Sequence, residues 1–258
     1  MLQPEPPPPA REGEDHGGED HRGQDHDGQE GHHRGQEDHH GGQEDHRGEA
    51  GGRVSGLFIT LEGGDGVGKS TQAALLTEWL ESQGRTVVRT REPGGTDAGV
   101  EIREIVLHHR GDIAPRAEAL LYAADRAHHV ATLVRPALER GDVVVQDRYI
   151  DSSVAYQGAG RVLGGDEVRD LSLWATEGLL PDLTILLDLD ETAARARLDT
   201  SRTRYDRLEA ERSEFHARVR AAFLELAAGE PERFLVVDAS RPIDEIAADI
   251  RQRLDGRV

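Results

Sequence analysis

The chain has 258 residues but no cysteine, a single lysine and only 4% aromatic side chains. The lack of cysteine excludes disulfide bonds, thiolate zinc sites and cysteine nucleophiles, so any catalysis must use oxygen or nitrogen groups or a bound metal. No apolar run approaches the roughly 20 residues of a membrane-spanning helix. The first residues also lack the charged-then-apolar pattern of a secretory signal. We therefore expect a cytoplasmic protein that makes no membrane contact.

Positive charge is scarce as well, because 31 basic residues stand against 50 acidic ones and give a formal net charge of −19. Sequence-independent binding of DNA or RNA depends on a basic surface that neutralises many phosphates. The charge balance therefore predicts no nucleic-acid partner. Any phosphate binding must depend on a small local group of donors.

The first 53 residues differ from the rest in composition. They hold 14 acidic residues, 8 of the 13 histidines and 12 of the 30 glycines, but almost no apolar side chains. Such a segment cannot offset the entropy cost of ordering its backbone, so residues 1–53 are predicted to be a disordered tail. The remaining 205 residues, 54–258, are long enough to bury the core of a single domain.

The tail repeats an Asp-His unit, as in Asp15-His16 and Asp45-His46. Imidazoles interleaved with carboxylates favour weak, reversible binding of divalent metal ions. The composition is equally typical of a solvated extension without a role of its own, and both interpretations stay open.

Five short apolar runs divide residues 54–258, and each is apolar or β-branched throughout, as in strands that are covered on both faces. They lie at Leu57–Leu61, Thr86–Val88, Val143–Val145, Leu183–Leu187 and Phe234–Val237. Segments with helical spacing separate them, for example around Leu76 and Leu80. Strands that alternate with helices indicate an α/β fold with an open parallel five-stranded sheet flanked by helices. Ligands of such sheets bind at the carboxyl ends of the strands.

A glycine-rich segment follows the first run directly, and it reads Gly63-Gly64-Asp65-Gly66-Val67-Gly68-Lys69-Ser70-Thr71. It fits the strand, G-x-x-x-x-G-K-[ST], helix pattern of a nucleotide phosphate loop. Glycines let backbone N–H groups turn toward a phosphate, and the helix that follows adds its positive end. We expect all nine residues to hold ATP, with Lys69 on the β- and γ-phosphates and Ser70 on Mg²⁺.

Lys69 is the only lysine among 31 basic residues. A compact ammonium group fits a tight phosphate loop where a planar guanidinium fits poorly. The single lysine also excludes the N/T-K-x-D loop with which GTPases select guanine. A histidine-rich tail before a phosphate loop resembles the nickel-insertion GTPases, but this domain does not fit them.

Four further clusters lie at or near the expected strand ends. They are T-R-E-P-G-G-T at 90–96, L-L-Y-A-A-D-R at 120–126, D-R-Y at 147–149 and S-S-V-A-Y-Q-G at 152–158. The second cluster puts Tyr122 and Arg126 four residues apart, and hence on one face of a helix. Asp147 ends an apolar strand and is a candidate to hold Mg²⁺ directly or through water.

Together with the phosphate loop, these clusters resemble the thymidylate kinases, a family of P-loop nucleoside monophosphate kinases. The motifs follow one another in the family's order over residues 57–254, and they include P-D-L-T-I-L-L-D at 181–188 and D-R-L-E at 206–209. The resemblance implies a P-loop kinase fold, ATP-dependent phosphorylation of dTMP to dTDP for the synthesis of dTTP, and a homodimer packed through helices.

The resemblance also implies roles for individual residues of the acceptor site. Arg91 and Arg148 match arginines that clamp the monophosphate, a task that suits their bidentate forks. Tyr122 stands where the family usually has a phenylalanine that stacks on thymine, and Arg126 matches an arginine at the base edge. The remaining candidates are Asp65 near the acceptor sugar and phosphate, Tyr156 where a ribose 2′-hydroxyl would sit, Ser153 and Gln157 at the base, and Arg103 at the phosphate.

Arginines are concentrated in a predicted lid at about 195–208, which contains Arg195, Arg197, Arg202, Arg204 and Arg207. Gly66 stands where some members of the family carry a catalytic arginine in the phosphate loop. Phosphoryl transfer requires positive charge near the γ-phosphate, so the lid is expected to supply it. We expect Lys69, Arg148, Arg202 and Arg204 to be the catalytic residues.

Three other functions remain open at this stage. A kinase for another deoxynucleotide or a nucleoside would share the motifs, although the pair Arg91 and Arg148 favours an acceptor that already bears a phosphate. A metallochaperone NTPase would hydrolyse nucleotide without dTMP and respond to nickel. An ordinary kinase fused to a metal-binding tail is also compatible with the sequence.

Overall fold

The computed structural model describes residues 56–159, 163–201, 206–209 and 211–257. The predicted tail at 1–53 and the two predicted catalytic arginines of the lid, Arg202 and Arg204, lie outside these residues. Within them, no helix is both long enough and apolar enough to cross a membrane.

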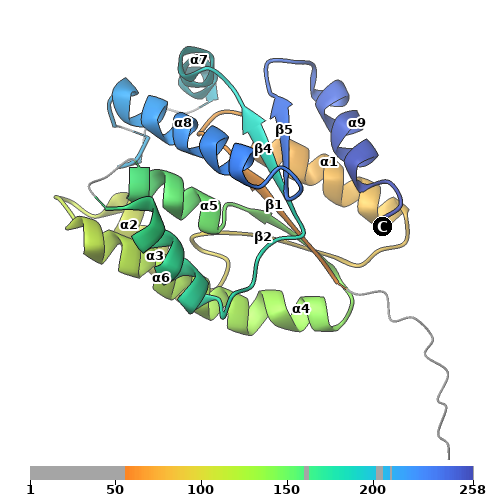
Figure 1. The fold of residues 1–258 in the computed structure, drawn as a ribbon, viewed down its shortest axis with the longest axis horizontal. Helices are drawn as coiled ribbons and strands as arrows, with labels where there is room; N and C mark the ends of the chain where they lie inside the picture. The colour runs from red at the N-terminus through yellow and green to blue at the C-terminus, as the bar shows by residue number, and fades with distance from the viewer. Residues whose placement is uncertain (1–55, 160–162, 202–205, 210, 258) are drawn as a thin grey trace, which may run out of the picture. The chain divides into compact units, whose positions relative to one another are not determined.

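A parallel five-stranded sheet forms the centre of the domain, as the apolar runs predict (Figure 1). Its strands are β1 (Leu57–Glu62), β2 (Val87–Arg91), β3 (Val143–Asp147), β4 (Leu183–Asp188) and β5 (Phe234–Asp238). They lie in the order β2-β3-β1-β4-β5, and every adjacent pair is parallel. Because β1 lies between β3 and β4, the loops that follow these three strands meet at one edge of the sheet.

Helices connect successive strands, and a last helix follows β5. They are α1 (Lys69–Ser82), α2 (Asp97–His108), α3 (Pro115–His129), α4 (Arg135–Glu139), α5 (Ile150–Ser153), α6 (Gly165–Ala175), α7 (Glu191–Ser201), α8 (Ser213–Gly229) and α9 (Ile243–Leu254). Two π-helical stretches, η1 (Val130–Val134) and η2 (Val154–Ala159), continue α3 into α4 and extend α5.

Local sequence explains where α2 and α3 begin. The side chain of Thr96 caps α2 by accepting a hydrogen bond from the N–H of Gly99 at 3.0 Å, and Asp97 adds a negative charge to the first turn. Pro115 occupies the first turn of α3, where its missing N–H costs no hydrogen bond.

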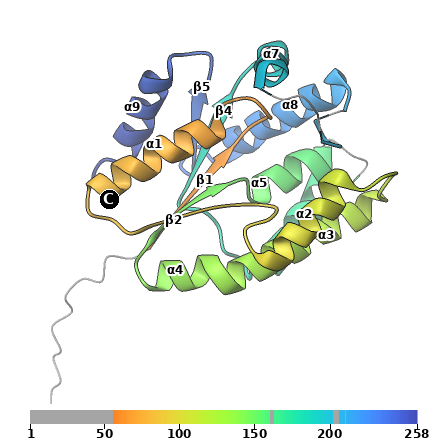
Figure 2. The same cartoon turned by 180° about the vertical axis from the view of Figure 1, so that it is seen from behind.

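Apolar residues on both faces of the sheet explain why the strands do not alternate with polar residues. On one face, Ile59 and Ile185 pack in a cluster with Leu76 of α1 and Ile246 of α9, the two helices in front in Figure 2. On the other face, β1 and β3 pack against the helical segment from η1 to α4, and β4 packs against α8. Burying each large apolar side chain contributes roughly 1.5–3 kcal/mol.

Candidate active site

The phosphate loop follows β1 and leads into α1, as the motif predicts. Gly63 and Gly66 have φ values of 126° and 79°, a backbone region that favours glycine. A Cβ atom on Gly66 would lie 2.6 Å from the carbonyl oxygen of Ala194. Because α7 lies directly against the loop at this point, an arginine at position 66 would require α7 to move.

Lys69 begins α1 and points back into the loop. Its Nζ donates to the carbonyl oxygens of Gly63 at 3.1 Å and Gly64 at 2.6 Å, and the residue is only 7% exposed. Burial and the nearby Arg148 guanidinium lower the pKa of Lys69, whereas the carboxylates of Asp147 and Asp65 act against this shift. The loop therefore holds one buried cation at its centre.

Arg148 connects the loop to the segment after β3. Its Nη1 donates to Gly63 O at 3.1 Å and to Ser152 Oγ at 3.0 Å, and its Nη2 donates to Asp65 Oδ1 at 2.6 Å and to the Tyr156 hydroxyl at 3.2 Å. Its backbone has a φ of 68°, which costs roughly 1–2 kcal/mol in a residue with a Cβ atom. Strained backbone of this kind is concentrated at functional sites.

Asp65 lies between the two cations of this region. Burial alone would raise its pKa, but the charges of Arg148 and Lys69 outweigh burial and hold the pKa of Asp65 well below its usual range. Tyr156 also donates its hydroxyl to Asp65 Oδ2 at 3.3 Å. The loop carboxylate is therefore ionised and fixed in position by two side chains of the acceptor side.

Glu62 is the last residue of β1 and belongs to none of the motifs. It is fully buried, and its two carboxyl oxygens accept hydrogen bonds from Tyr149 N at 2.7 Å, Ser152 N at 3.3 Å and Ser152 Oγ at 2.5 Å. Burial and the neighbouring Asp151 carboxylate raise the pKa of Glu62 to about 7. Glu62 therefore fixes the backbone that carries Arg148.

A second group of predicted residues surrounds a cavity of about 80 Å³, which we call the acceptor pocket. Its lining includes every residue that the sequence assigns to the acceptor except Arg91, namely Asp65, Arg103, Tyr122, Arg126, Arg148, Ser153, Tyr156 and Gln157. Tyr122 and Arg126 both reach this cavity from α3, as their spacing predicts. The chain thus brings together side chains from the phosphate loop, α2, α3, α5 and η2.

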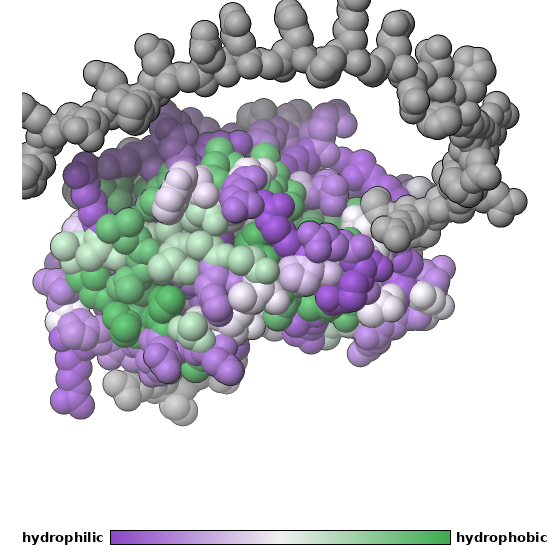
Figure 3. All heavy atoms as spheres, turned by 90° about the horizontal axis from the view of Figure 1, so that it is seen from below, coloured by the Kyte–Doolittle hydropathy of each residue, from purple (hydrophilic) through white to green (hydrophobic). Residues whose placement is uncertain are grey.

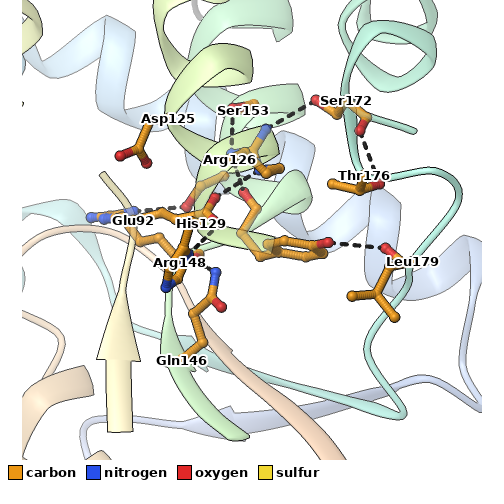
Figure 4. Close-up of polar contacts among 12 residues, drawn as sticks. Glu92, Asp125, Arg126, His129, Gln146, Arg148, Ser153, Ser172, Thr176 and Leu179 are labelled. Atoms are coloured by element: carbon orange, nitrogen blue, oxygen red, sulfur yellow. Dashed lines mark hydrogen bonds and ion pairs between the residues drawn. The ribbon is translucent and has the colours of Figure 1, made fainter. Parts of the chain in front are cut away.

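Arg126 is only 1% exposed and is held by four hydrogen bonds (Figure 4). Its Nε donates to Glu92 at 2.7 Å, its Nη1 to Ser172 at 3.1 Å, and its Nη2 to Ser153 Oγ at 3.0 Å and to the carbonyl oxygen of Tyr149 at 3.1 Å. A guanidinium group has five N–H donors, so one N–H has no acceptor among the described residues. These bonds orient the guanidinium at the wall of the acceptor pocket.

Glu92 is the centre of this network, and it lies inside the segment 90–96, where no feature of the sequence distinguishes it. Besides accepting from Arg126, its carboxylate bonds His129 Nδ1 at 2.9 Å, and His129 Nε2 bonds Thr90 Oγ1 at 2.7 Å. Both residues are buried. A buried network whose members all have partners rigidifies the groups that it holds.

Three arginines converge beside the pocket. Arg103 donates to Pro93 O at 2.9 Å, and its pKa is lowered by burial and then by the charge of Arg91, with a smaller contribution from Arg148. Arg91 ends β2 and is exposed. The positive charges of the three arginines repel one another, and an anion that binds among them relieves this repulsion.

The predicted Mg²⁺ ligands fit a hard divalent cation. Oδ1 of Asp147 is buried and makes no hydrogen bond with any described residue, and the side chain ends β3 beside the phosphate loop. Ser70 is exposed in the first turn of α1. Carboxylate and hydroxyl oxygens are the ligands that Mg²⁺ uses together with water and nucleotide phosphates.

Comparison with known proteins shows which family contains similar chains. A family model described as thymidylate kinase matches residues 61–250. A thymidylate kinase of Leifsonia xyli subsp. xyli is 85% identical over 203 residues, which cover 79% of this chain and 96% of that protein. One from Clavibacter sepedonicus is 78% identical over 200 residues and covers 78% of this chain and 95% of that protein.

The fold has a counterpart among solved structures. A thymidylate kinase from Ehrlichia chaffeensis superposes with a TM-score of 0.64 at 30% sequence identity, and the match covers 78% of this chain and 99% of that one. About a fifth of the chain therefore lies outside the match to each of these three proteins.

Proposed function

The chain belongs to the thymidylate kinase family and phosphorylates dTMP to dTDP with ATP; we propose that the residues described above divide this reaction between a donor side and an acceptor side. On the donor side, the phosphate loop Gly63–Thr71 holds the ATP phosphates with its backbone N–H groups. Lys69 then leaves its two carbonyl partners for the β- and γ-phosphates. Ser70 and Asp147 hold Mg²⁺, which neutralises charge on the phosphate oxygens.

On the acceptor side, Arg148 and Arg91 bind the dTMP phosphate, with Arg103 behind them. Tyr122 stacks on the thymine ring, and Arg126, Ser153 and Gln157 contact the base edge. Tyr156 packs against the sugar, where its hydroxyl and Asp65 leave little room for a 2′-hydroxyl group. The proximity of these residues around one cavity supports this assignment.

One observation carries the proposal, namely that the Arg148 guanidinium contacts both Gly63 and Asp65 of the phosphate loop while lining the acceptor pocket. The positive charge of Arg148 therefore acts on both the ATP phosphates in the loop and the dTMP phosphate in the pocket, between which the phosphoryl group moves. The acceptor oxygen is already anionic near neutral pH, so the transfer requires no general base. Alignment and charge stabilisation therefore provide the catalysis.

Additional charge on the γ-phosphate is assigned to Arg202 and Arg204 of the lid. The close contact of Gly66 with α7 supports this assignment, because the loop has no space for an arginine of its own. Replacing Arg202 with alanine should lower kcat much more than the affinity for dTMP, as expected when a contact forms only in the transition state. A loss confined to dTMP affinity would move Arg202 to the substrate-binding site.

The direct test is ADP formation from Mg²⁺-ATP with dTMP, dUMP, dCMP, AMP, thymidine or no acceptor, each with and without Ni²⁺. Rapid turnover with dTMP, weak turnover with dUMP and none with thymidine is expected. Hydrolysis without any acceptor that rises with Ni²⁺ would contradict the assignment and favour a metal-linked NTPase.

The proposal includes a homodimer that forms through α2, α3 and α6. Figure 3 shows hydrophobic side chains gathered at the end where these helices lie in Figure 1. Leu120 of α3 is 57% exposed and Trp174 of α6 is 81% exposed. The double variant Leu120→Glu/Trp174→Glu should elute as a monomer in light-scattering chromatography. Ile243→Glu, at an apolar position on α9 that is 55% exposed, serves as the control and should leave the assembly unchanged.

We also place the reaction in the cytoplasm and assign to the tail weak binding of divalent metal. The Asp-His repeats support the second assignment. Titration of the full chain with Ni²⁺, compared with a chain that lacks residues 1–53, measures it. Equal metal uptake by both chains would contradict the assignment.

A further inference from the structure

Glu118 lies one helical turn before Tyr122 on α3 and takes no part in the site as proposed. It is only 1% exposed. One carboxyl oxygen accepts a hydrogen bond from Gln157 Nε2 at 3.0 Å, and the other is paired with the guanidinium of Arg207. A buried carboxylate thus joins a residue of the acceptor pocket to the segment Asp206–Glu209.

The chemistry of a carboxylate fixes which way the Gln157 amide points. An ionised carboxylate has only acceptor atoms, whereas a side-chain amide has donors at nitrogen and an acceptor at oxygen. Gln157 must therefore turn its NH₂ group toward Glu118. This conclusion does not depend on how amide oxygen and nitrogen are told apart, because the reverse orientation would bring two acceptors together.

The amide oxygen of Gln157 is then available to a ligand. It makes no hydrogen bond with any described residue, although Gln157 is almost fully buried and lines the acceptor pocket beside Tyr122 and Ser153. Arg126, on the same wall, keeps one N–H donor after its four hydrogen bonds. The wall of the acceptor pocket therefore offers one acceptor of fixed orientation and one N–H donor on a fixed guanidinium group.

The Gln157 amide oxygen and the Arg126 N–H together match the hydrogen-bonding edge of thymine or uracil. Thymine and uracil present an N–H donor at ring position 3 and a carbonyl acceptor at position 4. Cytosine presents the opposite pattern, with an acceptor at position 3 and an amino donor at position 4. A site with a fixed acceptor and a fixed donor rejects the opposite pattern because its buried polar groups would be left unpaired.

We propose that Glu118 is a positioning residue for base specificity: its carboxylate holds Gln157 with the amide oxygen toward the acceptor pocket, and this orientation selects thymine over cytosine. Arg207 balances the charge of this buried carboxylate from a fixed position, because its Nε and backbone N donate to the carbonyl oxygens of Val106 and Leu107 at 3.0 and 3.1 Å. The inference rests on the proposed function, since it assumes that the pocket binds the base of dTMP.

Glu118→Gln provides the test. A glutamine of the same shape offers both a donor and an acceptor, so it supports either orientation of the Gln157 amide. The ratio of kcat/KM for dTMP to kcat/KM for dCMP should fall about tenfold to hundredfold, the effect of one buried hydrogen-bond mismatch. Circular dichroism and thermal unfolding check that the variant is folded.

Two further variants separate positioning from general stabilisation. Arg207→Gln removes the ion pair but leaves Glu118 facing Gln157, so it should preserve most of the dTMP-to-dCMP ratio even if stability falls. In a Gln157→Ala background, Glu118→Gln should change the ratio less than twofold, because the group that it orients is missing.

The outcomes also separate this inference from the proposed function. An unmodified chain that does not phosphorylate dTMP would overturn the proposed function. An unmodified chain that phosphorylates dTMP, together with a folded Glu118→Gln variant of unchanged ratio, would overturn only the role of Glu118. An equal loss of the ratio in Arg207→Gln would also overturn it, since the effect would then follow the ion pair.

Discussion

The donor and acceptor sides of this site are built in different ways. The phosphate loop is one continuous segment whose shape comes from glycines with positive φ, and its single cation bonds carbonyl oxygens of the same loop. The acceptor pocket is assembled from distant segments and is held by buried carboxylates, chiefly Glu62, Glu92 and Glu118. The first side depends on backbone conformation, and the second depends on long-range polar networks.

In the proposed reaction, this difference decides how a substitution propagates. On the donor side, the loss of a side chain removes one contact to phosphate and leaves the backbone cradle intact. On the acceptor side, the loss of one carboxylate frees a guanidinium or an amide that contacts the substrate, and it also leaves a buried charge unpaired. Donor-side variants should therefore change kcat, whereas acceptor-side variants should change KM, specificity and stability together.

The largest expected effect is that of Lys69→Ala. Because Lys69 bonds loop carbonyls and its ammonium is the single lysine charge of the chain, kcat should fall roughly 10²–10³-fold, the usual effect of removing one charge-stabilising donor. Thermal unfolding should stay near that of the unmodified chain. Arg241→Ala, which removes a cation that pairs with Glu245 and Asp249 and does not line the acceptor pocket, is the control. Activity close to normal in Lys69→Ala would refute the phosphate-loop assignment.

The contrast also explains what the sequence could predict. The strands, the loop and the helix at Lys69 could be predicted because each depends on neighbouring residues. Tyr122 and Arg126 could be placed on one face by helical spacing. Glu62 and Glu118 could not be recognised, because their importance arises from partners about 90 and 39 residues away, and a lone buried glutamate leaves no local pattern.

Glu92→Gln tests the networked side. The substitution removes the charge that pairs with Arg126 and bonds His129, so the guanidinium loses its strongest orienting contact. We expect KM for dTMP to rise about 10- to 100-fold with a much smaller change in kcat, and the protein to lose roughly 3–5 kcal/mol of stability. Steady-state kinetics and urea unfolding measure the two effects.

Glu104→Gln is the matched control for Glu92→Gln, because Glu104 is exposed on α2, where its carboxylate lies 3.9 Å from Nε2 of His108. It should change neither KM nor stability by a measurable amount. If Glu92→Gln lowers kcat while KM for dTMP stays constant, the network acts on the transfer step and the contrast between the two sides fails.

Glu62→Gln should change how stability depends on pH. Burial and Asp151 raise the pKa of Glu62 from 4.5 to about 7, so between these values the folded chain binds more protons than the unfolded chain. Stability attributable to Glu62 is therefore present below pH 4.5 and is lost as the pH rises through 7. The variant should show a flatter curve between pH 4.5 and 7 in urea unfolding at a series of pH values.

Asp125→Asn tests a second pH range in the same unfolding experiment. Burial and the Glu92 carboxylate raise the pKa of Asp125 from 3.8 to about 6, so its substitution should flatten the curve from about pH 4 to 6 and leave the upper part unchanged. Identical curves for both variants and the unmodified chain would mean that these carboxyl groups titrate normally. The account of the acceptor side as a buried carboxylate network would then be wrong.

Deletion of residues 1–53 should have the smallest effect, because the tail supplies none of the residues of either side. With 14 acidic residues and 5 arginines, the tail carries a negative charge that repels ATP and dTMP over roughly one Debye length, about 8–10 Å at physiological salt. Its removal should lower both KM values less than twofold at low ionic strength and leave kcat unchanged, and added salt should abolish the difference. A fall in kcat that persists at high salt cannot arise from screened charge, so it would make the tail a third part of the catalytic machinery beside the loop and the pocket.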